Sequence, residues 1–330
     1  MNSIIQYIIP ALLLVFTQAF AQNNNTADSL IREGIRLSNA GQNQQALSNY
    51  QQALKLDPYN AKALYQVGFL LHSNARDQEA IPYLQKLSTA SGTYAVNGLN
   101  LLGSIYDNSK QPDKAIQTYQ AAIKIDPQNR ELFYNVAIAY YKEQKFPEAE
   151  SSLASALKID PTHALTHRMY ALAAFHQGKN AVCILAFCNF LLLDPQSSQA
   201  LEAYTNIERI FAGSAAIKVT KPGVYTYDKY IVQAEVASKK APTSADRTLI
   251  KFKTLFTLIG ESAGKQTNKD FFSSFYADYF YKLAQSDNMP AFSHMVSLSA
   301  NKQVNSAWLT EHAQELGNLT NWVTATTHGL

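Results

Sequence analysis

Charged residues are scarce in this chain. Only 16% of its 330 residues are Asp, Glu, Lys or Arg, and the formal net charge is +3. Neither half contains a run of like charges. The sequence therefore lacks the basic surface that tight binding to a nucleic acid requires, and we expect no nucleic-acid partner.

Several catalytic and cofactor motifs are also missing. The sequence has no phosphate-binding glycine loop, no dinucleotide fingerprint, no CxxC pair and no paired-carboxylate signature. Cys183 and Cys188 are the only cysteines, and on one predicted helix their Cα atoms would lie about 8 Å apart, too far for a disulfide. We expect two buried apolar side chains, with paired metal or redox chemistry as the alternative, and no cofactor.

The first 21 residues contain no Lys, Arg, Asp or Glu. Their apolar run leads to Ala19-Phe20-Ala21, the small-x-small pattern of a signal-peptidase site. Residues 1–21 are therefore predicted to be a signal peptide and 22–26 a polar linker. We expect an exported protein, periplasmic or secreted, with no membrane span after cleavage. An uncleaved N-terminal membrane anchor is the alternative, although the run is short for a full span.

Four segments of the chain have similar sequences. "ALSNYQQALKLDPYN" at 46–60 returns as "AIQTYQAAIKIDPQN" at 115–129, "AESSLASALKIDPTH" at 149–163 and "CILAFCNFLLLDPQS" at 183–197. The prolines of the last three segments stand 34 residues apart, and the distance between the prolines of the first two segments is close to two such periods. This period is typical of a helix–turn–helix unit that stacks on copies of itself.

Small residues recur at fixed places of this period. With the proline at place 32, place 8 is Gly or Ala, place 20 is Ala in four units and Cys in the fifth, and place 24 is large and apolar. We expect the two helices of a unit to cross closely at the small places, because larger side chains would push them apart. Place 24 is expected to fill the groove between neighbouring units, and the proline ends the second helix.

These positions closely resemble the tetratricopeptide repeat (TPR) family. The resemblance implies an all-α fold, a TPR α-solenoid of about five helical hairpins, with residues 198–212 as a capping helix and the whole solenoid over 27–212. The second unit lacks the proline and has Gly92 near its end, which suggests a looser turn. The five units are 27–60, 61–95, 96–129, 130–163 and 164–197.

The period ends after Gly213. Residues 213–242 contain turn formers and β-branched residues and are predicted to be a linker or irregular segment. A capping-box pattern at Thr243 then starts a small α-helical domain over 243–330. The aromatic stripe within 271–280 is expected to belong to the core of that domain.

The resemblance also implies a binding surface. In such a stack the first helix of each unit lines a concave groove, and here its outward places carry rings and amides that suit an extended peptide. We expect a non-enzymatic scaffold that binds a protein or peptide partner, although packing within the stack is the alternative for several rings. The candidate groove residues are Tyr65, Phe69, His72, Asn97, Asn100, Ser104, Asn108, Tyr134, Ile138, Tyr141, Arg168, Leu172 and Phe175.

Other functions fit part of the sequence. One alternative is an assembly or structural protein whose groove is occupied by its own C-terminal domain. The chain is a serine hydrolase if Ser262 of the GESAG segment is a nucleophile, but fewer than 50 residues separate the repeats from Ser262, too few for the strands that such an elbow requires. His163 and His167 have the spacing of a metal pair on a helix, but no third ligand is near, so surface or capping roles are expected.

Overall fold

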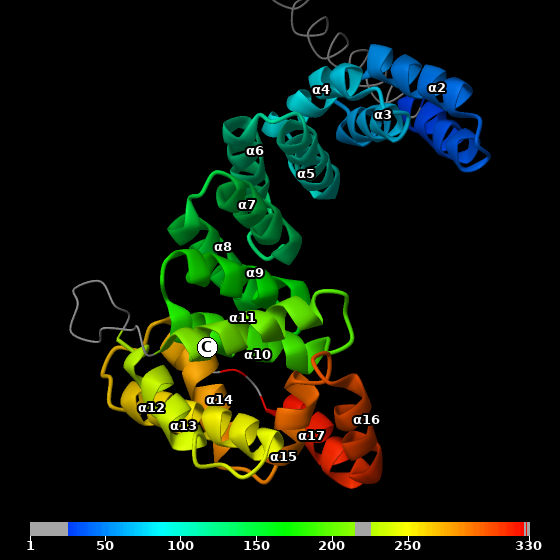
Figure 1. Ribbon diagram of the computed structural model, residues 1–330. Helices are drawn as coiled ribbons and strands as arrows, with labels where there is room; N and C mark the ends of the chain where they lie inside the picture. The colour runs from blue at the N-terminus through cyan, green and yellow to red at the C-terminus, as the bar shows by residue number, and fades with distance from the viewer. Residues whose placement is uncertain (1–25, 215–225, 327, 329–330) are drawn as a thin grey trace, which may run out of the picture. The chain divides into compact units, whose positions relative to one another are not determined.

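The computed structural model describes residues 26–214, 226–326 and 328. It divides into two compact units, Met1–Ala139 and Tyr140–Leu330. Every regular element of the described residues is a helix (Figure 1), which confirms the predicted all-α class. The predicted signal peptide lies outside the described residues, as does the polar linker apart from Thr26.

Unit 1 is a series of helical hairpins. Residues 26–39 are helical and precede α2. α3 packs on α2, α4 and α5, and α5 packs on α6, so first and second helices alternate as the 34-residue period predicts. The elements are α2 (Asn43–Leu56), α3 (Ala61–Ser73), α4 (Asp77–Gln85), the 3-10 turn η1 (Lys86–Thr89), α5 (Thr93–Asn108), α6 (Pro112–Ile125) and α7 (Arg130–Lys142).

The small residues of unit 1 leave room for a large side chain of the same hairpin. A Cβ atom at Gly34 would lie 2.4 Å from the Tyr50 ring, and one at Gly103 would lie 2.5 Å from the Tyr119 ring. Both rings are buried. The tight contact thus joins place 8 to place 24 within a hairpin, whereas the sequence assigned place 24 to the groove between hairpins.

The second hairpin ends in a different turn from the others, as the missing proline suggested. Its second helix, α4, continues as the 3-10 turn η1. Gly92 then has a φ of +81°, a left-handed conformation that glycine adopts at low cost. The turn is therefore longer than the Asp-Pro turns of the other hairpins.

Unit 2 begins with the last turn of α7. α9 packs on α8 and α10, and α11 packs on α10 at the predicted position of the capping helix. The border between the two compact units lies inside α7, and the domain boundaries drawn from the sequence stay a prediction. The repeat helices of this unit are α8 (Phe146–Ile159), α9 (Ala164–His176), α10 (Asn180–Leu193) and α11 (Ala200–Gly213).

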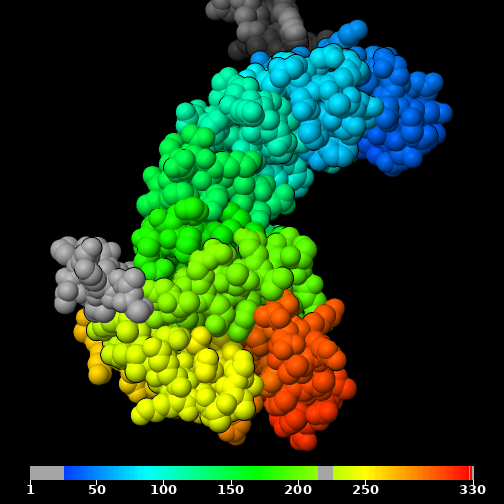
Figure 2. All heavy atoms as spheres, viewed as in Figure 1, coloured from blue at the N-terminus to red at the C-terminus, as the bar shows by residue number. Residues whose placement is uncertain are grey.

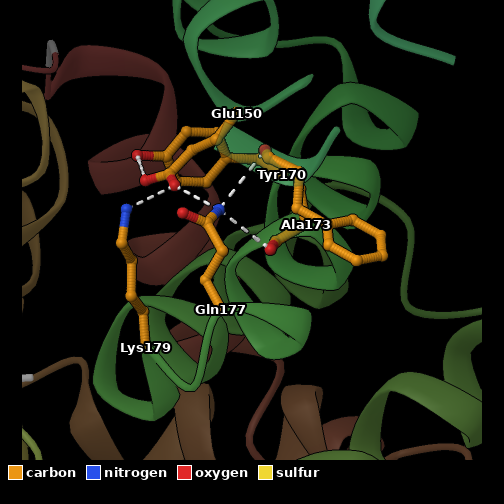
Figure 3. A network of polar contacts seen from close by, with 6 residues as sticks. Glu150, Tyr170, Ala173, Gln177 and Lys179 are labelled. Atoms are coloured by element: carbon orange, nitrogen blue, oxygen red, sulfur yellow. Dashed lines mark hydrogen bonds and ion pairs between the residues drawn. The ribbon is translucent and has the colours of Figure 1, made fainter. Parts of the chain in front are cut away.

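A partly buried carboxylate joins the repeat helices of unit 2 (Figure 3). Glu150 on α8 accepts hydrogen bonds from Gln177 Nε2 at 2.6 Å and from the Tyr170 hydroxyl at 3.2 Å. It also forms an ion pair with Lys179 Nζ at 2.5 Å, just before α10. One side chain thereby connects α8, α9 and the start of α10.

The C-terminal part of unit 2 is helical, as predicted for 243–330. Thr243 caps α13 by accepting a hydrogen bond from the Asp246 backbone N–H at 3.1 Å, and this confirms the predicted helix start. The aromatic stripe is mainly core, because five of its six rings are buried. The elements are α12 (Lys229–Ser238), α13 (Ser244–Gly264), the π-helical turn η3 (Ser273–Ala277), α14 (Asp278–Ala284), α15 (Met289–Val296), α16 (Lys302–Glu311) and α17 (Ala313–Ala325).

Helix α12 corrects one prediction. It lies within residues 213–242, which the sequence assigned to a linker or irregular segment. Ile231 and Ala234 of α12 are buried, and the helix packs on α13. The turn formers around α12 suggested an irregular segment, but tertiary packing stabilises the helix.

Helix α10 is covered on all sides. Every residue from Ala181 to Leu192 is buried, including both cysteines, which are free thiols. A helix that is apolar all round needs neighbours on every side, and α9, α11, α15 and η3 all pack on it. In Figure 2 the yellow and orange atoms of the C-terminal helices lie directly against the light green atoms of the last repeat helices.

Two buried polar side chains join the fifth hairpin to the C-terminal helices. His167 is fully buried, with Nδ1 2.6 Å from the Tyr276 hydroxyl and Nε2 2.8 Å from the Pro161 carbonyl oxygen, so the surface role expected for it is wrong. Burial lowers the pKa of His167 to about 3. Asp228, also buried, accepts hydrogen bonds from the backbone N–H of Ala181 at 2.8 Å. It thereby caps the N-terminus of α10 from a distant part of the chain.

Candidate peptide-binding site

An open hollow of about 450 Å³ lies on unit 1. It is lined only by side chains of α3, α5 and α7. The structure thus brings together five of the residues predicted to form the groove, Tyr65, Phe69, Asn97, Asn100 and Ser104. The full lining is Tyr65, Phe69, Asn97, Asn100, Leu101, Ser104, Glu131 and Asn135.

Helical spacing explains why these side chains share a face. Tyr65 and Phe69 are four residues apart on α3. On α5, both Asn97 and Ser104 lie three or four residues from the adjacent pair at 100–101. α3 is held at its start by Asn60, whose side chain accepts a hydrogen bond from the Ala63 N–H at 3.1 Å. The opposite faces of α3 and α5 are buried, so the lining residues face outward.

The α3 side of the hollow is aromatic. The ring centroid of Tyr65 lies 5.9 Å from that of Phe69 and 5.9 Å from that of Tyr94. Burial, with a smaller contribution from Tyr94, raises the pKa of Tyr65, so its hydroxyl is neutral at pH 7. Phe69 is 47% exposed, which leaves a large apolar face for a ligand to cover.

The α5 and α7 side is polar. Asn100 Nδ2 donates to Glu131 Oε1 at 2.9 Å, and Asn100 Oδ1 accepts from Asn135 Nδ2 at 2.9 Å. These two bonds fix the Asn100 amide between the helices. Asn97 is exposed and makes no side-chain hydrogen bond with any described residue, so its amide is free to pair with a ligand.

The other predicted groove residues of unit 1 lie outside the hollow. The imidazole of His72 is half-buried, with Nδ1 2.6 Å from Asp77 Oδ1. Asn108 is exposed at the end of α5, and Tyr134 and Ile138 are half-buried on α7. A role for these four residues in binding stays a prediction.

Three of the four predicted groove residues of unit 2 already have partners within the unit. The Tyr141 hydroxyl lies 2.9 Å from His176 Nε2, and Arg168 Nη2 donates to Glu202 Oε2 at 2.7 Å. Phe175 is 39% exposed and meets His176 edge to face, with centroids 5.9 Å apart. These residues are Tyr141, Arg168, Leu172 and Phe175, all on α7 or α9 and all at least partly exposed.

Three lining residues were missed from the sequence. Glu131 stands at place 2 of its unit, the place at which Asn97 was chosen, so the same rule identifies it. Leu101 and Asn135 both stand at place 6, next to a chosen place. They reach the hollow because a helix face is wider than one row of side chains.

The GESAG segment has a packing role. Ser262 lies within α13, and no strand precedes it among the described residues, so the strand–turn–helix of a nucleophile elbow is not formed there. Gly260 lies inside α13, which continues to Gly264. A Cβ at Gly260 would lie 2.3 Å from Tyr281 Cβ, so this glycine permits close contact between α13 and α14.

Metal and membrane features were also sought. His163 Nδ1 lies 2.6 Å from Thr166 Oγ1, and His167 is held by Tyr276 and Pro161. Within the described ranges no group of three or more His, Cys, Asp and Glu residues is placed to hold a metal ion. None of the described helices combines the length and the apolar character needed to cross a bilayer.

Comparison with known proteins bears on the repeats. Residues 36–167 match a family model described as the Psidin N-terminal TPR repeats region. This part of the chain is a tetratricopeptide repeat region. Such a region suggests a scaffold for contacts between proteins.

The TPR region is similar to parts of larger proteins. The protein O-mannosyl-transferase Tmtc3 of Drosophila melanogaster is 28% identical over 113 residues, which are 34% of this chain and 12% of that protein. The BBSome complex member BBS4 homolog of Drosophila melanogaster is 25% identical over 140 residues, which are 42% of this chain and 29% of that protein. The chain spans less than a third of either relative.

Solved TPR structures are similar as well. The crystal structure of YrrB, described as a TPR protein with an unusual peptide-binding site, is 23% identical with a TM-score of 0.49, over 58% of this chain and 97% of YrrB. A crystal structure of MamA is 21% identical with a TM-score of 0.45, over 49% of this chain and 95% of MamA.

Proposed function

We propose that this chain is a non-enzymatic scaffold that binds an extended segment of a protein partner in the hollow of unit 1. The observation that carries the proposal is that the exposed Phe69 ring and the free Asn97 amide line the same hollow. Covering the ring stabilises the complex by removing apolar surface from water. The amide matches the N–H and C=O groups of an extended backbone, which gives the peptide its direction.

Unit 1 is preferred over unit 2 as the binding site because of what the side chains already contact. In unit 2 the Tyr141 hydroxyl and the Arg168 guanidinium have intramolecular partners, which a ligand would have to displace. The hollow of unit 1 has an open ring and an unbonded amide. A groove filled by the chain's own C-terminal domain stays a prediction; within unit 2, C-terminal elements instead pack on α10.

Site-specific photo-crosslinking tests the proposal. A benzophenone amino acid replaces Phe69 in the hollow or, as a matched control, Tyr59, which is 72% exposed and does not line the hollow. We expect a discrete protein adduct from position 69 that is absent from position 59 and weakened by Asn97→Ala. The same adducts from both positions would contradict binding in the hollow.

We also propose that the chain is exported, on the strength of its uncharged, apolar first 21 residues and their Ala19-Phe20-Ala21 ending. Mass spectrometry of the N-terminal peptide from fractionated cells checks this. The expected result is a protein outside the cytoplasm that begins at Gln22. A chain that retains residues 1–21 in the membrane fraction would favour the anchor instead.

A further inference from the structure

The hollow of unit 1 contains a single formal charge, and this charge is negative. Glu131 is the only Asp, Glu, Lys or Arg among its lining residues. Its Oε1 accepts one hydrogen bond from the neutral Asn100 amide, and the carboxylate forms no ion pair with a described residue. Glu131 also lies in the first turn of α7, where the helix dipole favours a negative charge. A ligand in the hollow therefore meets an uncompensated carboxylate.

The aromatic side of the hollow also favours a cation. The faces of tyrosine and phenylalanine rings carry partial negative charge and attract ammonium and guanidinium groups. One cation already lies at the edge of this cluster, because Lys62 Nζ is 6.0 Å from the centroid of Tyr94, whose ring neighbours Tyr65. Rings and carboxylate thus select the same sign of charge.

We propose that the segment bound in the hollow carries an arginine that pairs with Glu131, next to an apolar residue that covers Phe69. This inference rests on the proposed function. Arginine fits better than lysine because its planar group can donate two N–H bonds to a carboxylate and also stack on a ring. An acidic segment is disfavoured, because Glu131 would repel it.

Two substitutions isolate the charge of Glu131. Glu131→Gln keeps an oxygen that can accept from Asn100 but removes the charge, and Glu131→Lys reverses the charge. Glu131 is exposed, so both variants are expected to keep the wild-type circular dichroism. Glu148→Gln is the matched control, because Glu148 is an exposed acid in the first turn of α8 that does not line the hollow.

The probe is a phage library of random ten-residue peptides selected on the full chain at low salt. We expect arginine to be enriched at one position of the peptides selected by the wild type and by Glu148→Gln. The enrichment should disappear with Glu131→Gln and change to Asp and Glu with Glu131→Lys. The tightest wild-type peptide should bind Glu131→Gln about tenfold more weakly in fluorescence anisotropy, and this difference should shrink in 0.5 M salt through screening.

Selection on Phe69→Ala distinguishes the inference about arginine from the proposed function on which it rests. Peptides that lose affinity for Phe69→Ala but show no excess of arginine overturn the inference and leave the proposed function standing. An excess of lysine without arginine, or an arginine preference that survives Glu131→Lys, overturns it equally. If no selected peptide is sensitive to Phe69→Ala, the proposed function fails and the inference fails with it.

Discussion

The second helices of the third and fifth hairpins follow the same 34-residue pattern but have different surroundings. In unit 1, α6 buries four residues, Ala115, Ile116, Tyr119 and Ala122. In unit 2, α10 is buried without a break over Ala181–Leu192, because α11, α15 and η3 pack on it besides α9. The difference teaches that a repeat departs from its pattern where another part of the chain covers it.

Place 4 of the repeat shows the same effect at a single position. It is Leu64 in the second unit and Leu99 in the third, and both are buried apolar side chains. In the fifth unit it is His167, which contacts the Tyr276 hydroxyl. The polar residue matches a polar partner outside the repeats, so the weakened pattern marks where the C-terminal helices pack.

The largest expected effect follows from removing that cover. A chain that ends at Ser214 leaves α10 with apolar residues facing water, so we expect α9–α11 to lose cooperative folding and the protein to aggregate. Hydrogen exchange with mass spectrometry checks this helix by helix. A soluble truncated chain whose α10 amides stay as protected as in the full chain would show that the C-terminal helices are dispensable.

Acid should destabilise unit 2 through His167. Burial lowers the pKa of His167 in the folded protein to about 3, whereas the imidazole of the unfolded chain has a pKa near 6.5. Between these pH values the unfolded imidazole binds a proton and the folded one does not. The stability contributed above pH 6.5 is therefore lost as the pH falls toward 3. This residue alone should remove about 3 kcal/mol between pH 7 and pH 4.

The check is denaturant unfolding at both pH values for the wild type and His167→Gln. The variant keeps a donor and an acceptor but cannot be protonated, so its loss on acidification should be smaller by about 3 kcal/mol. His328, whose pKa burial lowers to about 4, contributes to both proteins alike. Equal losses of stability in the two proteins would show that His167 does not cause the acid destabilisation.

A smaller effect is expected at the start of α10. Asp228→Ala removes the acceptor of the Ala181 and Asn180 backbone N–H groups and should lower the free energy of unfolding by about 1–2 kcal/mol. Asp246→Ala, which removes the side-chain acceptor of the exposed Thr243 N-cap of α13, serves as the comparison and should cost less. Thermal unfolding of both variants measures this, and an equal or larger effect at Asp246 would argue against a buried cap at α10.

The smallest effects compare two helical glycines. Gly103→Ala places a Cβ 2.5 Å from the buried Tyr119 ring and should destabilise by about 1–2 kcal/mol. Gly317→Ala in α17 meets nothing within 4 Å and should stabilise by about 0.5–1 kcal/mol through helix propensity. Chemical denaturation of the two variants checks the opposite signs, and a stabilising Gly103→Ala would show that this contact is not tight.

Some features could be predicted from the sequence because they are local or periodic. The 34-residue spacing and the prolines indicate the hairpins, and the fixed places identify five lining residues of the hollow. Asp228 could not be assigned its role, because it caps a helix that starts 48 residues earlier in the chain. The elements that cover α10, and the hydrogen bond from Asn135 to Asn100, likewise depend on contacts that no local pattern encodes.

The most direct measurement compares two phenylalanines, one in each unit. The tightest peptide selected on the full chain is titrated against Phe69→Ala and Phe175→Ala, whose rings are 47% and 39% exposed. Binding in the hollow of unit 1 predicts an affinity at least about tenfold weaker for Phe69→Ala, from the loss of an aromatic contact, and no change for Phe175→Ala. Unchanged affinity for Phe69→Ala, or a larger loss for Phe175→Ala, would contradict binding in that hollow.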